Sequence, residues 1–289
     1  MVVHVLHNPA AAKPAQRVAQ SIISKLTSDG HRVVDLTATT PQASSQSLAT
    51  AVERGEVERL VIAGGDGLVH LAIQHIATTD IAVTIAPIGS GNDFATALQE
   101  HATSLNVPAF SSDLIKVTAT DGAITWAASV AIAGFPADIN ARANTMGRVW
   151  GSSVYALATA RELPTFRRRT FELSIDEIPI TTNSAMLAIG NTKYFGGGML
   201  PCPDALPDDG SLHLTSIENV GRRGLVPHLL GRAGGTADRG EVLQGVGKRI
   251  EVDTARHDFW ADGEPLGTSP LTFEIVPNAL VVARVAESQ

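Results

Sequence analysis

Two short glycine-rich segments carry residue types that could bind a nucleotide. The first is Gly-Gly-Asp-Gly at residues 64–67, between an apolar run at 60–63 and a segment with helical spacing. Glycines let backbone N–H groups approach a phosphate closely, and the N-terminus of a following helix adds partial positive charge. Asp66 would repel a bare phosphate, so its presence indicates a divalent cation between the carboxylate and the nucleotide. The alternative is a tight turn in which Asp66 only caps the helix.

The second segment, Pro-Ile-Gly-Ser-Gly-Asn-Asp-Phe at residues 87–94, repeats this design. It follows the next apolar run, at 81–86, and combines glycines with a hydroxyl, an amide and the carboxylate of Asp93. If the two apolar runs are neighbouring parallel strands, both loops lie at the sheet edge where open α/β folds bind their ligands. Asp93 could instead only cap the helix that begins there. Two aspartate-bearing glycine loops at one edge favour a phosphate- and cation-binding site over two ordinary turns.

The elements around these loops indicate a parallel sheet. Strand and helix signals alternate over the first hundred or so residues, which is typical of strands joined by helices that cover the sheet. The expected strands are 2–6, 31–36, 60–63 and 81–86, and the expected helices are 14–26, 44–54, the segment from the first glycine loop to about 76, and 93–98. We therefore expect an α/β N-terminal nucleotide-binding domain, with a parallel sheet and flanking helices, over residues 1–118.

The pattern changes after about residue 113. Asp-Gly pairs at 121–122, 209–210 and 262–263 separate short apolar runs, as in antiparallel sheets. The expected strands are 114–118, 124–132, 171–175, 185–189, 211–217, 249–252 and 271–276, and one helix is expected at roughly 146–161. We expect a mainly antiparallel β C-terminal domain over residues 119–289, with the boundary near 113–122.

Composition limits the classes of function that remain open. The formal net charge of −7 argues against a nucleic-acid partner, because phosphate backbones require a basic footprint. No apolar run approaches the roughly 20 residues of a membrane-spanning helix, and residues 1–7 lack the basic segment of a secretory signal. Cys202 is the only cysteine, which rules out an internal disulfide and agrees with a reducing compartment. We expect a cytoplasmic protein.

The order of the motifs resembles the catalytic domain shared by diacylglycerol, sphingosine and ceramide kinases. The two glycine loops have the spacing of that family, and further matches continue in order along nearly the whole chain. These matches are Asn8-Pro9, Asp113-Leu114-Ile115, Gly190-Asn191, the segments 196–199, 203–205 and 208–210, and Asp262-Gly263-Glu264. The resemblance implies an ATP- and Mg²⁺-dependent lipid kinase, which phosphorylates the hydroxyl of a lipid alcohol such as diacylglycerol or a sphingoid base in an interdomain cleft.

The resemblance also assigns roles to individual residues. Asp66, Asp93 and Asp113 would organise Mg²⁺, partly through water, and Asp262, supported by Glu264, would act as the base. Asp209 would bind a second, structural Mg²⁺, with a type I′ turn as the alternative; Asp262-Gly263 could likewise be a routine hairpin turn. The residues expected to hold ATP are Asn8, Gly64, Gly65, Asp66, Gly67, Gly89, Ser90, Gly91 and Asn92.

Several positions depart from the commonest bacterial pattern of this family. Leu68 and Leu71 follow the first glycine loop where that pattern has Thr and Glu, although sphingosine kinases also carry Leu at the first of these positions. Ala11 and Ala12 replace a Ser-Gly pair, and Lys13 keeps the basic residue. Because Ala11 has no hydroxyl, the nucleotide would depend more on backbone groups.

Partner predictions depend on fewer residues. Arg167, Arg168 and Arg169 beside Phe166 could anchor the enzyme at anionic lipid headgroups, at about 1 kcal/mol per charge, or could form only a solvated face. We expect peripheral contact with a membrane surface, and a homodimer is compatible with such an enzyme. The histidines show no metal-ligand spacing, since His70 and His75 are five residues apart.

Two alternatives remain open from the sequence. A kinase that phosphorylates NAD also carries Gly-Gly-Asp-Gly, although the second loop and the Asp-Gly-Glu triplet fit lipid kinases better. A nucleotide- or lipid-binding relative without turnover would explain the departures at residues 11, 12, 68 and 71, but the retained Asp262 and Glu264 argue against it.

Overall fold

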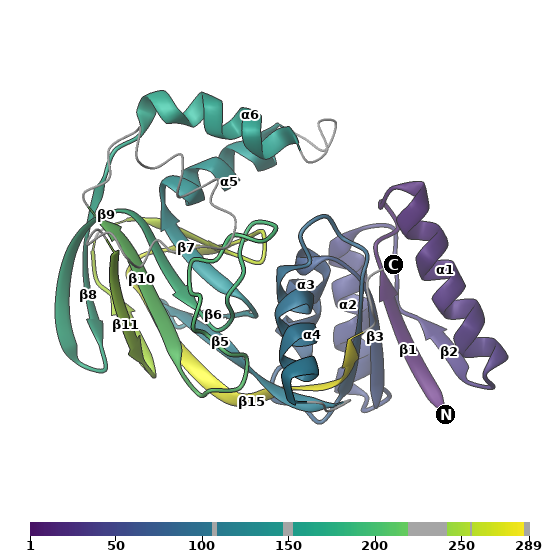
Figure 1. Cartoon of the computed structure of the whole chain (residues 1–289). Coiled ribbons are helices and arrows are strands. Elements are labelled where there is room, and N and C mark those ends of the chain that lie inside the picture. Colours follow the sequence, from purple (N-terminus) through teal and green to yellow (C-terminus); the bar gives the residue numbers. More distant parts are fainter. Residues whose placement is uncertain (106–108, 147–152, 219–241, 255, 286–289) are drawn as a thin grey trace.

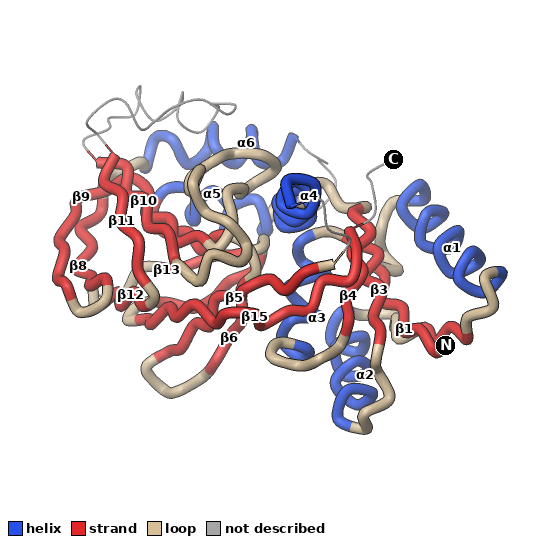
Figure 2. Tube along the Cα trace, turned by 60° about the horizontal axis from the view of Figure 1, so that its bottom comes forward, coloured by secondary structure: helices blue, strands red, loops and turns tan. Residues whose placement is uncertain are grey.

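The computed structural model of the 289-residue chain describes residues 1–105, 109–146, 153–218, 242–254 and 256–285. Its two halves differ in architecture (Figures 1 and 2). The elements of the first half are β1 (Val2–His7), α1 (Lys13–Ser28), β2 (Arg32–Asp35), α2 (Pro41–Glu53), β3 (Arg59–Gly64), α3 (Asp66–Ile76), β4 (Ala82–Pro87) and α4 (Asp93–Leu105).

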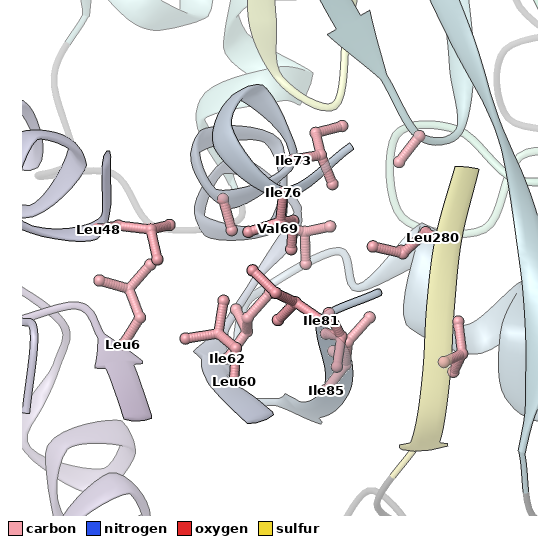
Figure 3. Packing of buried hydrophobic residues seen from close by; sticks show 14 of the residues in the cluster. Leu6, Leu48, Leu60, Ile62, Val69, Ile73, Ile76, Ile81, Ile85 and Leu280 are labelled. Carbon is pink, nitrogen blue, oxygen red and sulfur yellow. The ribbon is translucent and has the colours of Figure 1, made fainter. Parts of the chain in front are cut away.

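The first four strands form a parallel sheet. β1 pairs in parallel with both β2 and β3, and β3 pairs in parallel with β4. Successive residues of a strand face opposite sides of a sheet, so each strand buries apolar side chains on both faces. Val3, Val5 and Val61 pack with α1, and the other face of the sheet packs against α2 and α3. Figure 3 shows the core on that second face, where Leu48 of α2 and Ile73 of α3 lie over the strands.

The second half is mainly antiparallel. Its elements are β5 (Phe110–Ala119), β6 (Ile124–Ala127), β7 (Val130–Gly134), α5 (Phe135–Thr145), α6 (Ser153–Glu162), the 3₁₀ turn Leu163–Thr165, β8 (Arg169–Ile175), β9 (Ile178–Gly190), β10 (Leu212–Glu218), β11 (Val242–Gly247), β12 (Arg249–Val252), β13 (Asp258–Ala261), β14 (Glu264–Thr268) and β15 (Leu271–Val285). Antiparallel pairs join β7 and β8 to β9, and β9 to β10. The predicted fold class, α/β followed by mainly antiparallel β, is confirmed.

The long final strand β15 connects the two sheets. It pairs antiparallel with β5 and β12, and its last residues pair in parallel with β4, with Val281 opposite Ala82. All the strands therefore belong to one hydrogen-bonded network. Leu280 of β15 lies in the core of the first half (Figure 3). The sheet thus continues across residue 118, and the boundary between 1–118 and 119–289 remains a prediction.

Two predicted elements differ from the structure. The single strand expected at 124–132 is two strands, because the chain leaves β5 after β6 and joins β9 as β7. The helix expected at 146–161 corresponds to α6 from Ser153 onward, residues 147–152 lie outside the described ranges, and a further helix that was not expected, α5, precedes them. In the described parts of the chain, no helix is long and apolar enough to cross a bilayer.

Candidate active site

The two glycine loops touch each other at the carboxyl ends of β3 and β4. Gly64 is in register with Pro87, so the loops leave neighbouring strands side by side. A Cβ atom added to Gly89 would lie 2.4 Å from the Cα of Gly65, which is far inside van der Waals contact. Only glycine fits at this approach of backbone to backbone. The close contact explains why the sequence carries glycine in both loops.

The second loop is held in shape by its own asparagine. Asn92 has a φ of 59°, a left-handed conformation that asparagine tolerates better than most residues. Its Oδ1 accepts a hydrogen bond from the N–H of Gly89 at 2.9 Å, and its Nδ2 donates to the carbonyl of Gly89 at 3.0 Å. The Asn92 amide therefore closes the loop, whereas Ser90 at its tip is exposed.

Asn8 lies beside these loops at the end of β1. The register places His7 opposite Ala63, so Asn8 follows the strand that neighbours β3. The Oδ1 atom of Asn8 accepts a hydrogen bond from the N–H of Ala10 at 2.9 Å, which shapes the turn into α1. The three predicted nucleotide segments therefore share one edge of the parallel sheet.

Asp66 and Asp93 form an acidic pair around Gly91. Asp66 begins α3 and accepts a hydrogen bond from the N–H of Phe94 at 3.2 Å. A Cβ at Gly91 would lie 2.9 Å from Oδ2 of Asp66 and 3.7 Å from Oδ2 of Asp93. Burial, and then the charges of Asp93 and Asp262, raise the pKa of Asp66 to about 6. Burial also raises the pKa of Asp93. Both residues would hold their negative charge more easily beside a cation.

A third glycine segment clamps Asp93. Both carboxylate oxygens of Asp93 accept hydrogen bonds from the N–H of Gly197, at 3.0 and 2.9 Å, and Oδ1 accepts a further one from Gly198 at 2.9 Å. Gly197 and Gly198 have φ values of 85° and 107°, which favour glycine. The Gly-Gly-Gly motif of the second half thus fixes a carboxylate of the first half.

Asp262 lies in the two-residue turn between β13 and β14. Its φ of 54° and the 85° of Gly263 are those of a tight hairpin, so the turn interpretation is correct as local structure. The side chain is nevertheless directed inward and the residue is only 6% exposed. Its Oδ1 accepts from the N–H of Ser129 at 3.0 Å and its Oδ2 from the N–H of Ala128 at 2.8 Å. These two donors lie between the end of β6 and the start of β7. The break between the two strands therefore leaves both N–H groups available to bind the Asp262 carboxylate.

His70 is a residue of this site that the sequence analysis missed. Its Nδ1 lies 3.2 Å from Oδ2 of Asp262, and both side chains are largely buried. His70 comes four residues after Asp66 on α3 and therefore shares a helix face with it. That spacing was the available signal.

Glu264 approaches the same helix from the second half. A Cβ at Gly67 would lie 3.3 Å from Oε1 of Glu264, so this carboxylate faces the N-terminal turn of α3. Unlike Asp262, Glu264 is exposed. The Asp-Gly-Glu triplet therefore presents one buried and one exposed carboxylate to the first glycine loop.

Asp113 and Asp209 form a second acidic group. Asp113 accepts hydrogen bonds from the N–H groups of Asn278 and Gly210, both at 2.8 Å. Burial raises the pKa of Asp113, and the charges of Asp209 and Asp208 act in the same direction. The structure thus groups Asp113 with Asp209, while Asp66 and Asp93 lie in the field of Asp262.

Asp209 has hydrogen-bond partners within its own turn. Its carboxylate accepts from the N–H groups of Leu206 and Ser211, at 3.1 and 2.9 Å, and contacts Nε2 of His213 at 2.9 Å. Among the described residues, no three His, Cys, Asp or Glu side chains form a complete metal centre. One or two carboxylates with waters and phosphate oxygens suffice for Mg²⁺, so Asp66 and Asp93 fit that ion.

Leu68 and Leu71 have a structural explanation. A Cβ at Gly64 would lie 2.5 Å from Cδ2 of Leu68, which therefore covers the strand end. Both leucines pack against the core of the first half. Their departure from the commoner Thr and Glu extends an apolar surface and leaves the carboxylates described above in place.

Comparison with known proteins decides the family. Residues 2–120 match the diacylglycerol kinase catalytic domain, and residues 129–284 match the YegS C-terminal NAD kinase beta sandwich-like domain. The chain belongs to this lipid kinase family. The resemblance seen in its motifs is confirmed, and it favours a lipid kinase over an NAD kinase.

Relatives of this lipid kinase cover most or nearly all of its length. It is 31% identical to a protein of Mycobacterium tuberculosis named diacylglycerol kinase, over 98% of this chain and 94% of the relative. It is 28% identical to a probable YegS-like lipid kinase of Klebsiella pneumoniae, over 78% of this chain and 77% of the relative. A crystal structure of a diacylglycerol kinase from Bacillus anthracis shares the fold, with a TM-score of 0.72 and 15% identity over 98% of this chain and 96% of that one.

Proposed function

We propose that this lipid kinase transfers the γ-phosphate of ATP to the hydroxyl of a lipid alcohol, with diacylglycerol as the first candidate and a sphingoid base as the second. The observation that carries the proposal is the convergence of Asp66, Asp93 and Asp262, which come from three separate segments. The charges of Asp93 and Asp262 both act on Asp66. The names of the relatives, diacylglycerol kinase and YegS-like lipid kinase, support the class of acceptor.

The nucleotide would bind along the edge where β1, β3 and β4 end. Backbone N–H groups of the two glycine loops, with Asn8 and the exposed hydroxyl of Ser90, would contact its phosphates. Asp66 and Asp93 would hold Mg²⁺, which neutralises charge on the phosphates when bound. The positive end of the α3 helix dipole would add to this neutralisation.

Asp262 would accept the proton of the lipid hydroxyl. The hydroxyl oxygen forms a bond to the γ-phosphorus, the bond to the β,γ-bridging oxygen breaks, and ADP leaves. The proton passes to a carboxylate oxygen of Asp262. The N–H groups of Ala128 and Ser129 fix that carboxylate in place, which favours catalysis by a positioned base. Glu264, beside Gly67, would support the charge balance at the phosphate end of the site.

Other parts of the proposal depend on the resemblance. Asp113 would act on Mg²⁺ only indirectly, through its hydrogen bond with Gly210 beside Asp209, and Asp209 would hold a structural cation. We place the nucleotide domain at 1–118 and the lipid domain at 119–289. We also propose peripheral contact with a membrane surface in the cytoplasm, and a homodimer is compatible with this arrangement.

The decisive experiment follows labelled γ-phosphate from ATP–Mg²⁺ into a panel of lipid alcohols in mixed micelles. Wild type and Asp262→Asn are compared, with an arm in which NAD replaces the lipid. We expect label in one lipid class with wild type and a loss of about 10²- to 10⁴-fold in kcat with Asp262→Asn, because that range is typical of a positioned base. Equal activity of both proteins would remove Asp262 from its role, and label in NAD alone would overturn the lipid assignment.

A further inference from the structure

A basic pocket lies in the second half of the molecule, away from the glycine loops. Its volume is about 480 Å³, and the residues that line it come from the start of β8, the turn between β12 and β13, and α5. We call it the arginine pocket. Its lining residues are Asp138, Arg167, Arg168, Arg169, Thr170, Thr254, Arg256, His257 and Asp258.

The arginine pocket has an excess of positive charge. Four arginines line it against two aspartates, in a chain whose formal net charge is −7. Arg169 already neutralises Asp138, because its Nη2 donates to both carboxylate oxygens at 2.8 Å. Asp258 accepts a hydrogen bond from the hydroxyl of Thr268 at 2.7 Å. The arginines of the lining therefore outnumber its aspartates.

Two of these arginines have no carboxylate partner. Within the described ranges of the chain, neither Arg167 nor Arg256 is within ion-pair distance of an acidic side chain, and both are exposed residues of the pocket lining. They come from segments almost ninety residues apart, so the pocket is assembled by the fold and is not a mere run of charge. A guanidinium group presents a planar fork of donors that matches phosphate oxygens.

The side chain of His257 lies within the electrostatic field of two of the pocket arginines. Its Nε2 lies 3.2 Å from the carbonyl oxygen of Thr170, and its ring packs against Phe171 with centroids 4.6 Å apart. Burial lowers the pKa of His257, and the charges of Arg169 and Arg167 lower it further. A bound anion would oppose this effect of the arginines.

From the charge excess, the two arginines without an acidic partner and the volume of the pocket, we propose that the arginine pocket binds the phosphate group of an anionic phospholipid headgroup. A free phosphate ion has the same binding chemistry and is the other source. The inference rests on the proposed function only for the choice of a lipid as source. The sequence predicted contact with anionic lipid from Arg167 to Arg169 alone. The pocket adds Arg256 and gives this contact a defined site.

The phosphate bound here is not the one that is transferred. Asp258, which lines the pocket, begins β13, and Asp262, the proposed general base, directly follows the last residue of that strand. Four residues of strand span about 13 Å. A lipid held by its headgroup at the arginine pocket is therefore a neighbour of the acceptor lipid. The pocket would keep the enzyme at an anionic surface while the acceptor hydroxyl reaches Asp262.

The test uses Arg167→Gln/Arg256→Gln, with Arg17→Gln/Arg54→Gln as the control. Arg17 and Arg54 are exposed residues of the first half, so the control makes the same change of net charge elsewhere. Sedimentation with vesicles of phosphatidylcholine and phosphatidylglycerol is compared with vesicles of phosphatidylcholine alone. We expect the pocket variant to bind anionic vesicles roughly 30-fold more weakly than wild type, from about 1 kcal/mol for each of two charges, and the control to bind nearly as wild type.

A second measurement separates the two sources of phosphate. Calorimetric titration with inorganic phosphate, and the pKa of His257 followed by NMR, report occupancy of the pocket without any catalysis. If phosphate raises the pKa of His257 in wild type but vesicle binding is equal in all proteins, the ligand is a soluble phosphate. If the pocket variant matches the control in both vesicle and phosphate binding, the proposal is overturned.

The proposed function is tested separately on the same proteins. Phosphate transfer to a monomeric short-chain acceptor should be similar in wild type and in the pocket variant, because Arg167 and Arg256 do not belong to the site at Asp262. Absence of transfer in wild type would count against the kinase assignment. It would leave the phosphate-binding result at the arginine pocket unaffected.

Discussion

Nδ1 of His70, on α3 of the first half, lies 3.2 Å from Oδ2 of Asp262, in the β13–β14 turn of the second half. The contact joins the helix that begins with Asp66 to the residue proposed as the base. Together with the N–H groups of Ala128 and Ser129, it leaves the Asp262 carboxylate little freedom to rotate. His70 therefore acts as a positioning residue for Asp262.

Replacement of His70 by Leu should lower kcat by about tenfold, less than the loss expected for Asp262→Asn, because the base would remain but be less well oriented. The KM for ATP should stay close to that of wild type. His70→Asn can place its amide donor near the position of Nδ1, so it should recover most of the lost rate. Steady-state kinetics of the three proteins check this. Equal losses in both His70 variants, accompanied by equal losses of stability, would indicate a purely structural contact.

Gly89→Ala should damage the nucleotide site more than Gly67→Ala does. A Cβ at Gly89 meets the backbone of Gly65 at 2.4 Å, whereas a Cβ at Gly67 meets only the flexible end of Glu264 at 3.3 Å. Overpacking against backbone costs about 1–3 kcal/mol, so Gly89→Ala should unfold at lower urea and bind ATP weakly. Gly67→Ala should unfold close to wild type. The comparison fails if both variants unfold at the same urea concentration.

Asp66→Asn should stabilise the metal-free protein while it abolishes activity. Burial and the charges of Asp93 and Asp262 raise the pKa of Asp66 from 3.8 to about 6. The folded state then binds more protons than the unfolded state between these values, so the free energy of unfolding falls as the pH rises from about 4 to about 6. Removal of the charge should return about 1–3 kcal/mol at neutral pH.

Urea unfolding in EDTA, at acidic and at neutral pH, measures this effect. Asp80→Asn is the control, because Asp80 is exposed and lies away from the acidic pair. Added Mg²⁺ should stabilise wild type more than Asp66→Asn, since ion binding to the folded state adds to its stability. If Asp66→Asn were less stable than wild type at neutral pH, the ionised carboxylate of Asp66 would not destabilise the metal-free fold, contrary to its raised pKa.

The Asp209→Asn variant distinguishes two interpretations of Asp209, as a ligand of a structural cation or as part of a turn without a cation. If Asp209 holds a cation as proposed, EDTA should lower the Tm of wild type by several degrees and should hardly change that of the variant. The hydrogen bonds from Leu206 and Ser211 alone predict a loss of about 1 kcal/mol that is the same with and without EDTA. Thermal unfolding of both proteins, with and without chelator, distinguishes the two results.

The sequence was informative where a motif is local. The glycine loops were recognisable because their close contact requires glycine at Gly65 and Gly89, and alternating elements led to the correct fold class. The partners of Asp262 were invisible because the N–H groups of Ala128 and Ser129 carry no side-chain signature. His70 was missed because its partner is 192 residues away along the chain.

Long-range pairing explains the remaining errors. The division of 124–132 into β6 and β7 depends on pairing with β5 and β9, which local apolar patterning does not encode. The clamp on Asp93 by Gly197 and Gly198 likewise connects residues more than a hundred positions apart. Apolar patterns that repeat within a few residues predict individual helices and strands. Contacts between residues far apart in the sequence decide how those helices and strands pack together.

The pairing of β15 with β4 has a consequence for synthesis on the ribosome. β4 emerges early, but β15, the strand that covers its open edge, follows every other strand in chain order. During translation the nascent parallel sheet exposes unpaired backbone groups along β4, a surface prone to pairing with other chains. The nascent chain would therefore depend on protection by chaperones until β15 has been synthesised, and loss of β15 would uncover the edge of the nucleotide half.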